Sequence, residues 1–486
     1  MILIADILAR LQSFGLLAQP VPRTELTVTG VSDDSREVRA GDLYCAIRGY
    51  VHDGHRYLKD AVEAGAVAAL VETPESGVDV PQFQVADSRR AAAIAAQVVF
   101  GDPAVDLKLV GVTGTNGKTT TVHLARHILS RRYASGSLGT LGVIDASGKR
   151  EETTLTTPGP IEFARRLAKL KQDGVENVVA EISSHALAQG RVDGVTFDVG
   201  VFTNLSRDHL DYHTDIEEYR ATKSRLADLV AADGALVVNA DDPAWSALPD
   251  RGRLIRYGLR AEGDYMARDI KLGPHGSKWT LVTPEGPVPA TLPLPGEFNV
   301  SNALAAVAVA AGAFDIEAPE VAKSLATAPP VPGRLEVLAE QPLVVRDFAH
   351  TPDALRRALI ALRPLVSGSV IVVFGCGGDR DPGKRPLMGQ VAAVNADFTI
   401  VTSDNPRSEV PEAIIADITP GLGSAIYEQH VDRRVAIARA LDMAGPDDAV
   451  LLAGKGHEVY QIIGTERRPF DEALIVEELL SGRKRV

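Results

Sequence analysis

Long apolar runs, basic segments and cysteine pairs are all scarce in this sequence. It has no run of about 18 apolar residues, so no membrane-spanning helix is predicted. The formal net charge is −13, and no segment is dense enough in Lys and Arg to suggest a nucleic acid as partner. The two cysteines, Cys45 and Cys376, lack metal-ligand spacing and suit a reducing compartment. Residues 1–17 lack a basic leader and resemble a short amphipathic helix, so we expect a cytoplasmic protein.

The length and composition indicate several globular domains. With 486 residues, 45% hydrophobic and 24% charged, the chain exceeds one hydrophobic core, and about two to four domains are expected. The segment APPVPGRLE at 328–336 is typical of a stiff linker, and Gly101-Asp102-Pro103 suits an earlier boundary. We therefore predict domains at 1–101, 102–331 and 332–486.

Short apolar segments alternate with helical stretches along the chain, which predicts an α/β fold. Such alternation favours mostly parallel sheets covered on both faces, with ligands at the carboxyl ends of the strands. The expected strands are 42–47, 67–72, 107–113, 138–143, 177–182, 198–203, 235–239, 343–348, 369–374, 397–402 and 448–453. The expected helices are 55–64, 88–99, 118–130, 161–173, 217–232, 299–312, 353–364, 385–394, 411–418 and 432–444, with antiparallel hairpins at 266–292.

The stretch KLVGVTGTNGKTTT at 108–121 predicts a nucleotide triphosphate site. An apolar strand leads into a glycine-rich turn, and Lys118 and Thr119 open a helix. Backbone N–H groups and the helix dipole favour an anion there. Lys118 is then expected to reach the β- and γ-phosphates while Thr119 contacts Mg²⁺. The strict phosphate-loop pattern requires Gly where this chain has Val112, and an ordinary strand-to-helix turn is the alternative.

Polar residues follow two further strands of the same predicted sheet. Glu181 closes the strand at 177–182, where an acidic Mg²⁺ ligand of a phosphate-loop protein would lie, although strand-end carboxylates are commonly just solvated. His209 follows the strand at 198–203, and a loop histidine with no metal role is its simpler interpretation. Lys223 falls on the apolar stripe of the helix at 217–232. Periodicity does not decide whether Lys223 extends to solvent or is desolvated and able to react with CO₂.

Charged loops also follow the strands of the third predicted domain. The guanidinium groups of Arg380 and Arg407 can each donate two parallel hydrogen bonds to a carboxylate. The carboxylates of Asp404 and Glu458 can accept hydrogen bonds from ammonium groups. Arg380 occupies the third glycine position of a dinucleotide fingerprint, so NAD is not expected. If these loops converge, they suit a small zwitterion with more than one carboxylate. Separate solvated loops are the alternative.

The motifs together resemble the Mur ligases of peptidoglycan synthesis, and within them the enzymes that attach the third residue of the stem peptide. The resemblance covers nearly the whole chain and rests on segments that occur in the family's order. They are GTNGKTT (114–120), TTP (156–158), EISSHAL (181–187), NLSRDHLDYH (204–213), GEFNVSNALAA (296–306), GRLE (333–336), DFAHTPDAL (347–355), GCGGDRD (375–381), DNPR (404–407) and GKGHE (454–458).

The resemblance implies a fold and a reaction. It implies an N-terminal UDP-binding α/β domain, a central P-loop NTPase-like parallel-sheet domain and a C-terminal Rossmann-like domain. A carboxylate of UDP-MurNAc-L-Ala-D-Glu attacks the γ-phosphate of ATP, and an amino acid amine then displaces phosphate from the acyl phosphate. The expected role is cell-wall synthesis, and so cell shape and division. The expected cofactors are Mg²⁺, as two ions, and a CO₂-derived carbamate on Lys223; ATP is a co-substrate, and we expect a monomer.

The resemblance also implies site residues. Lys118, Glu181, His209 and Lys223 would be catalytic, and Thr119, Glu181, His209 and carbamylated Lys223 would surround the metal. The residues expected to bind ATP are Gly114, Thr115, Asn116, Gly117, Lys118, Thr119, Thr120, Asn302, Arg334 and Asp347. Those expected to bind the UDP-sugar peptide are Ser35, whose loop could equally be a solvated turn, and Thr156, Thr157, Ser183, Gln189 and Arg191. The loop Tyr50-Val51-His52 is a weaker match.

For the amino acid, the DNPR segment resembles the meso-diaminopimelate pattern. The residues expected to bind it are Arg380, Asp404, Asn405, Pro406, Arg407, Gly454 and Glu458. L-Lysine or L-ornithine is the alternative substrate, and Asn405 and Arg407 argue against both. A folylpolyglutamate synthetase is another alternative within the same class. It would share the glycine-rich turn but should lack the first, UDP-binding domain that residues 1–100 indicate here. A non-catalytic nucleotide-binding regulator is the alternative of another class, against which the joint presence of Lys118, Glu181, His209 and Lys223 argues.

Overall fold

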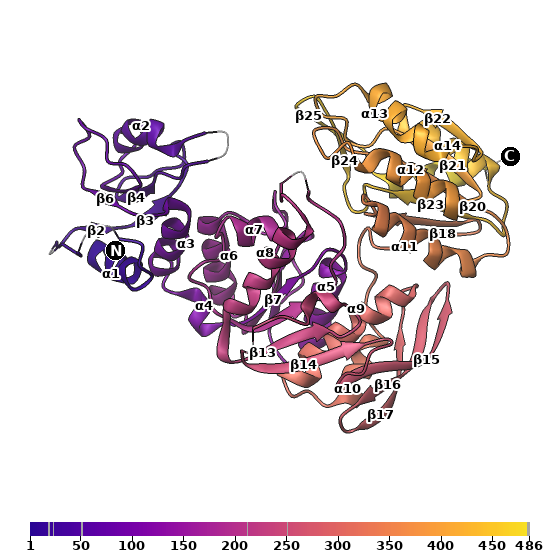
Figure 1. Ribbon diagram of the computed structural model, residues 1–486, viewed down its shortest axis with the longest axis horizontal. Helices are drawn as coiled ribbons and strands as arrows, with labels where there is room; N and C mark the ends of the chain where they lie inside the picture. Colours follow the sequence, from indigo (N-terminus) through magenta and orange to yellow (C-terminus); the bar gives the residue numbers. More distant parts are fainter. Residues whose placement is uncertain (18–19, 23, 50–51, 211, 250, 484–486) are drawn as a thin grey trace.

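The computed structural model describes residues 1–486 except 18–19, 23, 50–51, 211, 250 and 484–486. Its α/β units follow one another along the chain, with the first residues at one end of the molecule and the C-terminal sheet at the other (Figure 1). The α/β class and the parallel-rich sheets expected from the alternating pattern are confirmed.

The first unit is built on a small parallel sheet in the order β3-β4-β5-β6. Its strands are β3 (Gly30–Ser32), β4 (Asp42–Cys45), β5 (Ala68–Val71) and β6 (Gln82–Gln84), and its helices are α1 (Ile4–Ser13), α2 (Leu58–Glu63) and α3 (Ser88–Val99). A two-stranded pair, β1 (Ile2–Leu3) and β2 (Thr27–Val28), lies beside them. The helix α3 packs on helix α6 (Pro160–Gln172) of the next unit, which joins the two units.

The middle unit holds a large sheet in the order β10-β9-β8-β11-β7-β12-β13-β14-β15-β16-β17. Pairing is parallel from β8 to β15 and antiparallel at both ends. The strands are β7 (Lys108–Thr113), β8 (Ser135–Gly139), β9 (Gly142–Ile144), β10 (Arg150–Glu151), β11 (Asn177–Glu181), β12 (Phe197–Phe202), β13 (Val230–Asn239), β14 (Arg253–Gly258), β15 (Tyr265–Gly273), β16 (Gly276–Thr283) and β17 (Gly286–Leu292). The helices are α4 (Pro103–Asp106), α5 (Lys118–Leu129), α6 (Pro160–Gln172), α7 (Ser184–Ala188), α8 (Ile216–Asp228), α9 (Glu297–Val307) and α10 (Ala318–Leu325).

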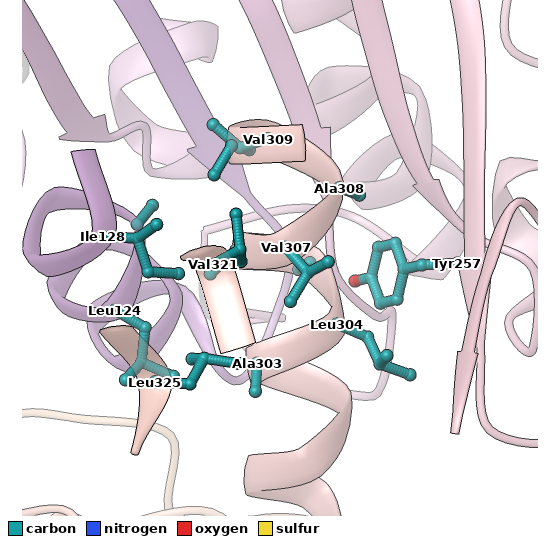
Figure 2. Close-up of a cluster of buried hydrophobic side chains, with 14 of the residues drawn as sticks. Leu124, Ile128, Tyr257, Ala303, Leu304, Val307, Ala308, Val309, Val321 and Leu325 are labelled. Carbon is teal, nitrogen blue, oxygen red and sulfur yellow. The ribbon is translucent and has the colours of Figure 1, made fainter. Parts of the chain in front are cut away.

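Helices cover both faces of this sheet, which is why its central strands are apolar throughout. On one face Leu124 and Ile128 of α5 pack with Leu304 and Val307 of α9, as Figure 2 shows. On the other face α6 and α8 cover the sheet through residues such as Phe163 and Leu226. The helix α9 is buried all round, as expected for a helix without a polar face.

Two expected elements differ in the structure. The strand expected at 138–143 is interrupted at Thr140 and Leu141, where the chain turns between β8 and the antiparallel β9. The helix expected at 217–232 ends at Asp228, because Val230 already pairs with Phe197 as the start of β13. Apolar residues at a helix–strand junction fit either pattern, so periodicity carries the helix too far.

The third unit has a sheet in the order β18-β19-β23-β20-β21-β22, parallel except at β18. Its strands are β18 (Glu336–Glu340), β19 (Leu343–Asp347), β20 (Val370–Phe374), β21 (Phe398–Thr402), β22 (Tyr427–His430) and β23 (Ala449–Ala453), with a separate hairpin of β24 (Tyr460–Ile463) and β25 (Glu466–Pro469). Its helices are α11 (Pro352–Leu362), α12 (Lys384–Asn395), α13 (Pro411–Ile418), α14 (Arg433–Met443) and α15 (Glu472–Arg483). In the described part of the chain, no helix is long and apolar enough to cross a membrane.

Candidate active site

A cavity of about 1120 Å³ lies where the carboxyl ends of the middle sheet face those of the third sheet. Most of the residues predicted for ATP, metal and amino acid line this one cavity, together with two of those predicted for the UDP-sugar peptide, Thr156 and Ser183. They are Thr115, Asn116, Gly117, Lys118, Thr119, Thr120, Thr156, Glu181, Ser183, His209, Lys223, Asn302, Arg334, Asp347, Arg380, Asp404, Asn405, Arg407, Gly454 and Glu458. The sequence did not decide whether the charged loops of the third domain are separate or converge. In the structure they converge on this cavity.

The phosphate loop connects β7 to α5 at one end of the cavity. Gly114 has φ 136° and Gly117 has φ 87°, both in the region that favours glycine. A Cβ on Gly114 would collide with Thr203, and one on Gly117 would collide with Asn302. The ammonium of Lys118 folds back and donates to the carbonyls of Gly114 and Thr115, both at 2.8 Å. Burial lowers the pKa of Lys118, and the nearby Arg334 lowers it further.

Glu181 ends β11 beside the phosphate loop, because β11 pairs with β7 in parallel and Glu181 stands opposite Val112. Its carboxylate is 1% exposed. Oε2 accepts from the hydroxyls of Thr119 and Thr140, each at 3.1 Å, and Oε1 accepts from the backbone N–H of Thr140 at 2.8 Å. The interruption between β8 and β9 thus serves to bring Thr140 onto Glu181.

The donor set at Thr119 and Glu181 fits a hard divalent cation. Mg²⁺ binds through one or two carboxylates and keeps waters or phosphate oxygens as its other ligands. In the described residues no group of three or more His, Cys, Asp or Glu is placed to hold a metal ion. Neutral His209 adds a nitrogen donor on the same cavity, since burial lowers its pKa to about 3. The ring of His209 lies 4.8 Å from that of His185.

Lys223 is buried and does not extend to solvent. It lies on α8, is 1% exposed, and donates to the carbonyl of Gly114 at 2.8 Å. Its ammonium is also 4.5 Å from the ring centre of Tyr219. Burial lowers the pKa of Lys223 well below its usual value, and the charge of Lys118 lowers it further. A neutral amine is the form that reacts with CO₂, so the environment fits a carbamate.

The residues expected to bind the UDP-sugar peptide fall into two places. Arg191 donates to the carbonyl of Thr157 at 2.8 Å and to Oε1 of Gln189 at 2.6 Å. Thr157 in turn donates to the carbonyl of Glu181 at 2.7 Å and accepts from the backbone N–H of Ser183 at 3.0 Å. These side chains form a connected group beside Glu181.

Ser35 belongs to the other place, a turn after β3 in the first unit. The described hydrogen bonds and ion pairs do not join it to the Thr157–Arg191 group. Of the loop Tyr50-Val51-His52, the first two residues lie outside the described part of the chain.

Arg334 connects the third unit to the phosphate loop. Its guanidinium donates to the hydroxyl of Thr119 at 3.0 Å and stacks 4.6 Å from the ring centre of Phe348. Asp347, at the end of β19, accepts from the backbone N–H of Leu335 at 2.7 Å, and burial raises its pKa. Asn302 of α9 faces the cavity beside Gly117. Of these three residues expected to bind ATP, Asn302 and Arg334 therefore lie against the phosphate loop, and Asp347 lines the same cavity.

The DNPR segment follows β21 and is held by the hairpin of β24 and β25. The backbone N–H of Arg407 donates to Ile462 at 3.1 Å, and that of Gly464 donates to Arg407 at 2.8 Å. These bonds hold Arg407 at φ 53°, an uncommon conformation for a non-glycine residue. Its guanidinium donates to the carbonyl of Gly378 at 2.7 Å. Burial lowers the pKa of Arg407, as does neighbouring Arg380.

The GKGHE segment follows β23 and meets DNPR from the other side. Lys455 is 0% exposed, and its ammonium lies 3.2 Å from Oδ1 of Asn405 and 3.2 Å from Oε2 of Glu458. Asn405 also donates to Oε2 of Glu458 at 2.8 Å. The three side chains form a closed triangle of hydrogen bonds.

A buried ion pair lies under these two loops. Arg433 and Glu472 are both 0% exposed on their side chains and are 2.8 Å apart. Arg433 also donates to the carbonyls of Ser403 at 3.4 Å and Ala453 at 2.9 Å, immediately before Asp404 and Gly454. The pair therefore fixes the ends of β21 and β23.

Some residues at the cavity were missed in the sequence. Thr140 was hidden inside an expected strand, and Lys455 inside a motif assigned only to its glycine and glutamate. Asp353, within DFAHTPDAL, accepts from the amide of Asn116 at 3.1 Å and so joins α11 to the phosphate loop. His350 also lines the cavity, and burial lowers its pKa to about 4.

Comparisons with known proteins match the whole arrangement. Residues 27–118 match the model described as Mur ligase family, catalytic domain; residues 112–310 match Mur ligase middle domain; and residues 333–456 match Mur ligase, glutamate ligase domain. The chain is 41% identical to UDP-N-acetylmuramoyl-L-alanyl-D-glutamate--2,6-diaminopimelate ligase of Bacillus licheniformis, over 93% of this chain and 94% of the relative. It is 43% identical to the protein of the same name from Gloeobacter violaceus, over 95% of each.

Solved structures give the same result. A structure of UDP-N-acetylmuramoyl-L-alanyl-D-glutamate--2,6-diaminopimelate ligase has a TM-score of 0.68 at 33% identity and covers 97% of this chain and 98% of its own. MurF ligase from Thermotoga maritima in complex with ADP shares the fold, with a TM-score of 0.66 at 20% identity over 96% of this chain and 100% of its own. Folylpolyglutamate synthase of Mycobacterium tuberculosis, complexed with ADP, has a TM-score of 0.64 at 18% identity and covers 74% of this chain and 91% of its own.

Proposed function

The chain belongs to the Mur ligase family, and on that premise we propose that it joins meso-diaminopimelate to UDP-N-acetylmuramoyl-L-alanyl-D-glutamate in an ATP-dependent reaction. The observation that carries the proposal is one cavity with a phosphate loop at one end and the Arg380–Arg407 pair at the other. The identity of 41% to the Bacillus licheniformis ligase extends over 93% of this chain and so includes both ends.

In the first step, a substrate carboxylate oxygen attacks the γ-phosphorus of ATP and ADP leaves, which gives an acyl phosphate. The protein has little covalent work in phosphoryl transfer and acts by positioning and by stabilising charge. The ammonium of Lys118 donates to carbonyls of its own loop. When ATP binds, it exchanges these carbonyls for phosphate oxygens. Arg334 and the N-terminus of α5 add positive charge beside it.

In the second step, the amine of the amino acid attacks the acyl carbon, loses a proton and expels inorganic phosphate, which leaves an amide. Both substrates must meet inside a cavity that excludes water, because water would hydrolyse the acyl phosphate. The cavity spans two units, so their relative motion can open and close it.

We propose that Thr119, Glu181, His209 and Lys223 hold Mg²⁺, with Lys223 as a carbamate. Bound there, two Mg²⁺ ions would neutralise the charge of the triphosphate and of the attacking carboxylate. Glu181 is oriented by its hydrogen bonds with Thr140, and burial lowers the pKa of Lys223.

For the UDP-sugar peptide, we propose contacts with Ser35 in the first unit and with Thr156, Thr157, Ser183, Gln189 and Arg191 beside Glu181. Arg191 is tied to Thr157 and Gln189, which supports a rigid surface for the peptide next to the phosphate loop.

For the amino acid, we propose that Arg407 and Arg380 bind its carboxylates and that Asp404 and Glu458 accept from its ammonium groups. Pro406 fixes the turn, and Gly454, with φ 114°, lets the backbone approach. Lysine lacks the distal carboxylate and would leave Arg407 unpaired, so discrimination by a factor of about 10⁴ is expected.

We also propose functional domains at 1–101, 102–331 and 332–486, a cytoplasmic monomer, and a role in cell-wall growth that extends to cell shape and division. The first unit supports the UDP-sugar substrate over a folate, since the folylpolyglutamate synthase neighbour covers only 74% of this chain.

A ligation assay tests the proposal directly. Purified protein receives ATP, Mg²⁺, UDP-N-acetylmuramoyl-L-alanyl-D-glutamate and either diaminopimelate, lysine or ornithine, with the product identified by mass and phosphate release measured. We expect a product with diaminopimelate and phosphate release that requires both substrates. A lysine or ornithine product would replace the amino acid assignment, and nucleotide binding without any product would indicate a regulator.

A further inference from the structure

Lys455 lies at the amino-acid end of the cavity, yet it is buried and faces away from the space that a substrate would occupy. Its side chain is 0% exposed, whereas that of Glu458 is 18% exposed. Only Glu458 of the two lines the cavity among the described residues. Lys455 therefore acts on a substrate through its neighbours and not by contact.

Its neighbours are the side chains of two proposed substrate-binding residues. The ammonium lies 3.2 Å from Oε2 of Glu458 and 3.2 Å from Oδ1 of Asn405. Oδ1 of Asn405 also accepts from the backbone N–H of Ile462 at 2.9 Å, so the amide has its oxygen on the Lys455 side. The amide nitrogen of Asn405 then donates to the same Oε2 at 2.8 Å. Both donors hold Oε2 and direct the carboxylate of Glu458.

Arg407 lines the same cavity as Glu458 and is a competing partner for its carboxylate. Asp404, Glu458 and Asp379 all interact electrostatically with Arg407. Among the side-chain hydrogen bonds of the described residues, its guanidinium donates to a neutral carbonyl, that of Gly378 at 2.7 Å. A carboxylate without a nearer cation would turn to that guanidinium, since a charged fork and a carboxylate pair strongly. Arg407 would then be neutralised inside the protein and lost to a substrate carboxylate.

We propose that Lys455 is a positioning residue that serves as the internal counter-ion of Glu458, keeps Glu458 off Arg407, and so preserves selection for an amino acid with a second carboxylate. The inference rests on the proposed function, because it concerns the same amino acid site. It explains how this chain accommodates a lysine with no solvent exposure, where a bare charge is costly unless it is paired.

The test compares Lys455→Met with a matched variant on the neighbouring hairpin of β24 and β25. Arg467 is exposed, and its guanidinium lies 4.1 Å from the ring centre of Tyr460, the ring that Lys455 approaches to 5.8 Å. Arg467→Met removes a cation from that ring without touching Asn405 or Glu458. The readouts are KM for diaminopimelate, KM for ATP, and the ratio of kcat/KM for diaminopimelate over lysine.

We expect Lys455→Met to raise KM for diaminopimelate by about 30- to 100-fold, as when one partner of a buried charge pair is removed. KM for ATP should stay within about twofold of the wild-type value, and the preference for diaminopimelate over lysine should fall, while Arg467→Met leaves all three unchanged. The double variant Lys455→Met/Glu458→Gln removes the carboxylate that would block Arg407. It should recover part of the lost preference relative to Lys455→Met alone.

Equal rises in both KM values, or a double variant no more selective than Lys455→Met, would overturn the counter-ion role. If Lys455→Met does not fold, as judged by circular dichroism, Lys455→Gln provides the same test, since it keeps donors but lacks the charge. Wild-type protein that does not ligate diaminopimelate would instead overturn the proposed function, so the two failures are distinct.

Discussion

The two ends of the cavity use buried cations in opposite ways. At the phosphate end, Lys118 and Lys223 donate to backbone carbonyls of the phosphate loop, and burial lowers the pKa of both. At the amino-acid end, Lys455 is as buried as Lys223 but lies 3.2 Å from the carboxylate of Glu458. One end holds its cations with neutral oxygens, and the other supplies an anion from the protein.

This difference distinguishes lysines that take part in the reaction from a lysine that only positions its neighbours. A buried cation that meets only neutral oxygens is destabilised in its charged form, so it favours either an incoming anion or loss of its proton. A buried cation that already has a carboxylate is stable as it is, and removal of either partner leaves an uncompensated charge. We therefore expect Lys118 and Lys223 to change partner or state during the reaction and Lys455 to stay fixed.

The largest expected effect comes from Lys223→Ala, which removes the proposed carbamate. Activity should fall by at least about 10³-fold, the scale on which an essential electrostatic group acts. Formate or acetate should restore part of it by filling the space with a carboxylate, and wild-type activity should depend on dissolved CO₂. Steady-state phosphate release with and without added formate measures both.

The matched control is Lys169→Ala, because Lys169 is an exposed helix lysine of the same unit, paired with Asp173. It should keep full activity and show no response to formate. Retained activity in Lys223→Ala, or wild-type activity indifferent to CO₂, would remove the contrast between the two ends.

Much of the phosphate end of the cavity could be predicted from the sequence. The phosphate loop, Glu181 at a strand end and Lys223 on an apolar stripe are local patterns, and parallel pairing brings strand ends together. The α/β class followed from the same alternation and is confirmed. Periodicity marked Lys223 as unusual but did not tell a buried amine from an extended one, since that depends on how Tyr219 and Gly114 pack around it.

Contacts between distant segments were beyond local patterns. Thr140 reaches Glu181 only because the chain breaks between β8 and β9, whereas the apolar run predicts one continuous strand. Lys455 meets Asn405 from 50 residues away, and no spacing signals that pairing. The helix predicted at 217–232 ends at Asp228 in the structure. The apolar residues that follow Asp228 belong to strand β13 of the sheet, and their pattern also fits a helix.

Arg407→Ala tests the amino-acid end with a smaller effect. It should raise KM for diaminopimelate by about 10²- to 10³-fold, since a buried charged partner of the distal carboxylate is lost. KM for ATP should be nearly unchanged, because the phosphate end keeps its own cations. Measurement of both KM values in one assay series checks this.

Arg468→Ala is the control for this change, as Arg468 is exposed on β25 and pairs with Glu466. It should leave both KM values unaltered. A rise in KM for ATP equal to that for diaminopimelate would place Arg407 outside amino acid binding.

The smallest expected effect is a pH dependence of stability that belongs to Lys223 alone. Its folded-state pKa lies below the ordinary 10.5, so between those two values the unfolded chain binds a proton that the folded chain does not. Stability must then rise with pH in that window, at most by about 1.4 kcal/mol per pH unit for one group. In CO₂-free buffer, the free energy of unfolding of wild type relative to Lys223→Met should therefore increase as the pH rises toward 10.5. Both tryptophans of the chain, Trp245 and Trp279, are buried in the middle unit, so their fluorescence during urea unfolding reports this region. Lys169→Met should follow wild type in parallel, and parallel curves for Lys223→Met would mean that the folded chain keeps the proton on Lys223 throughout this window.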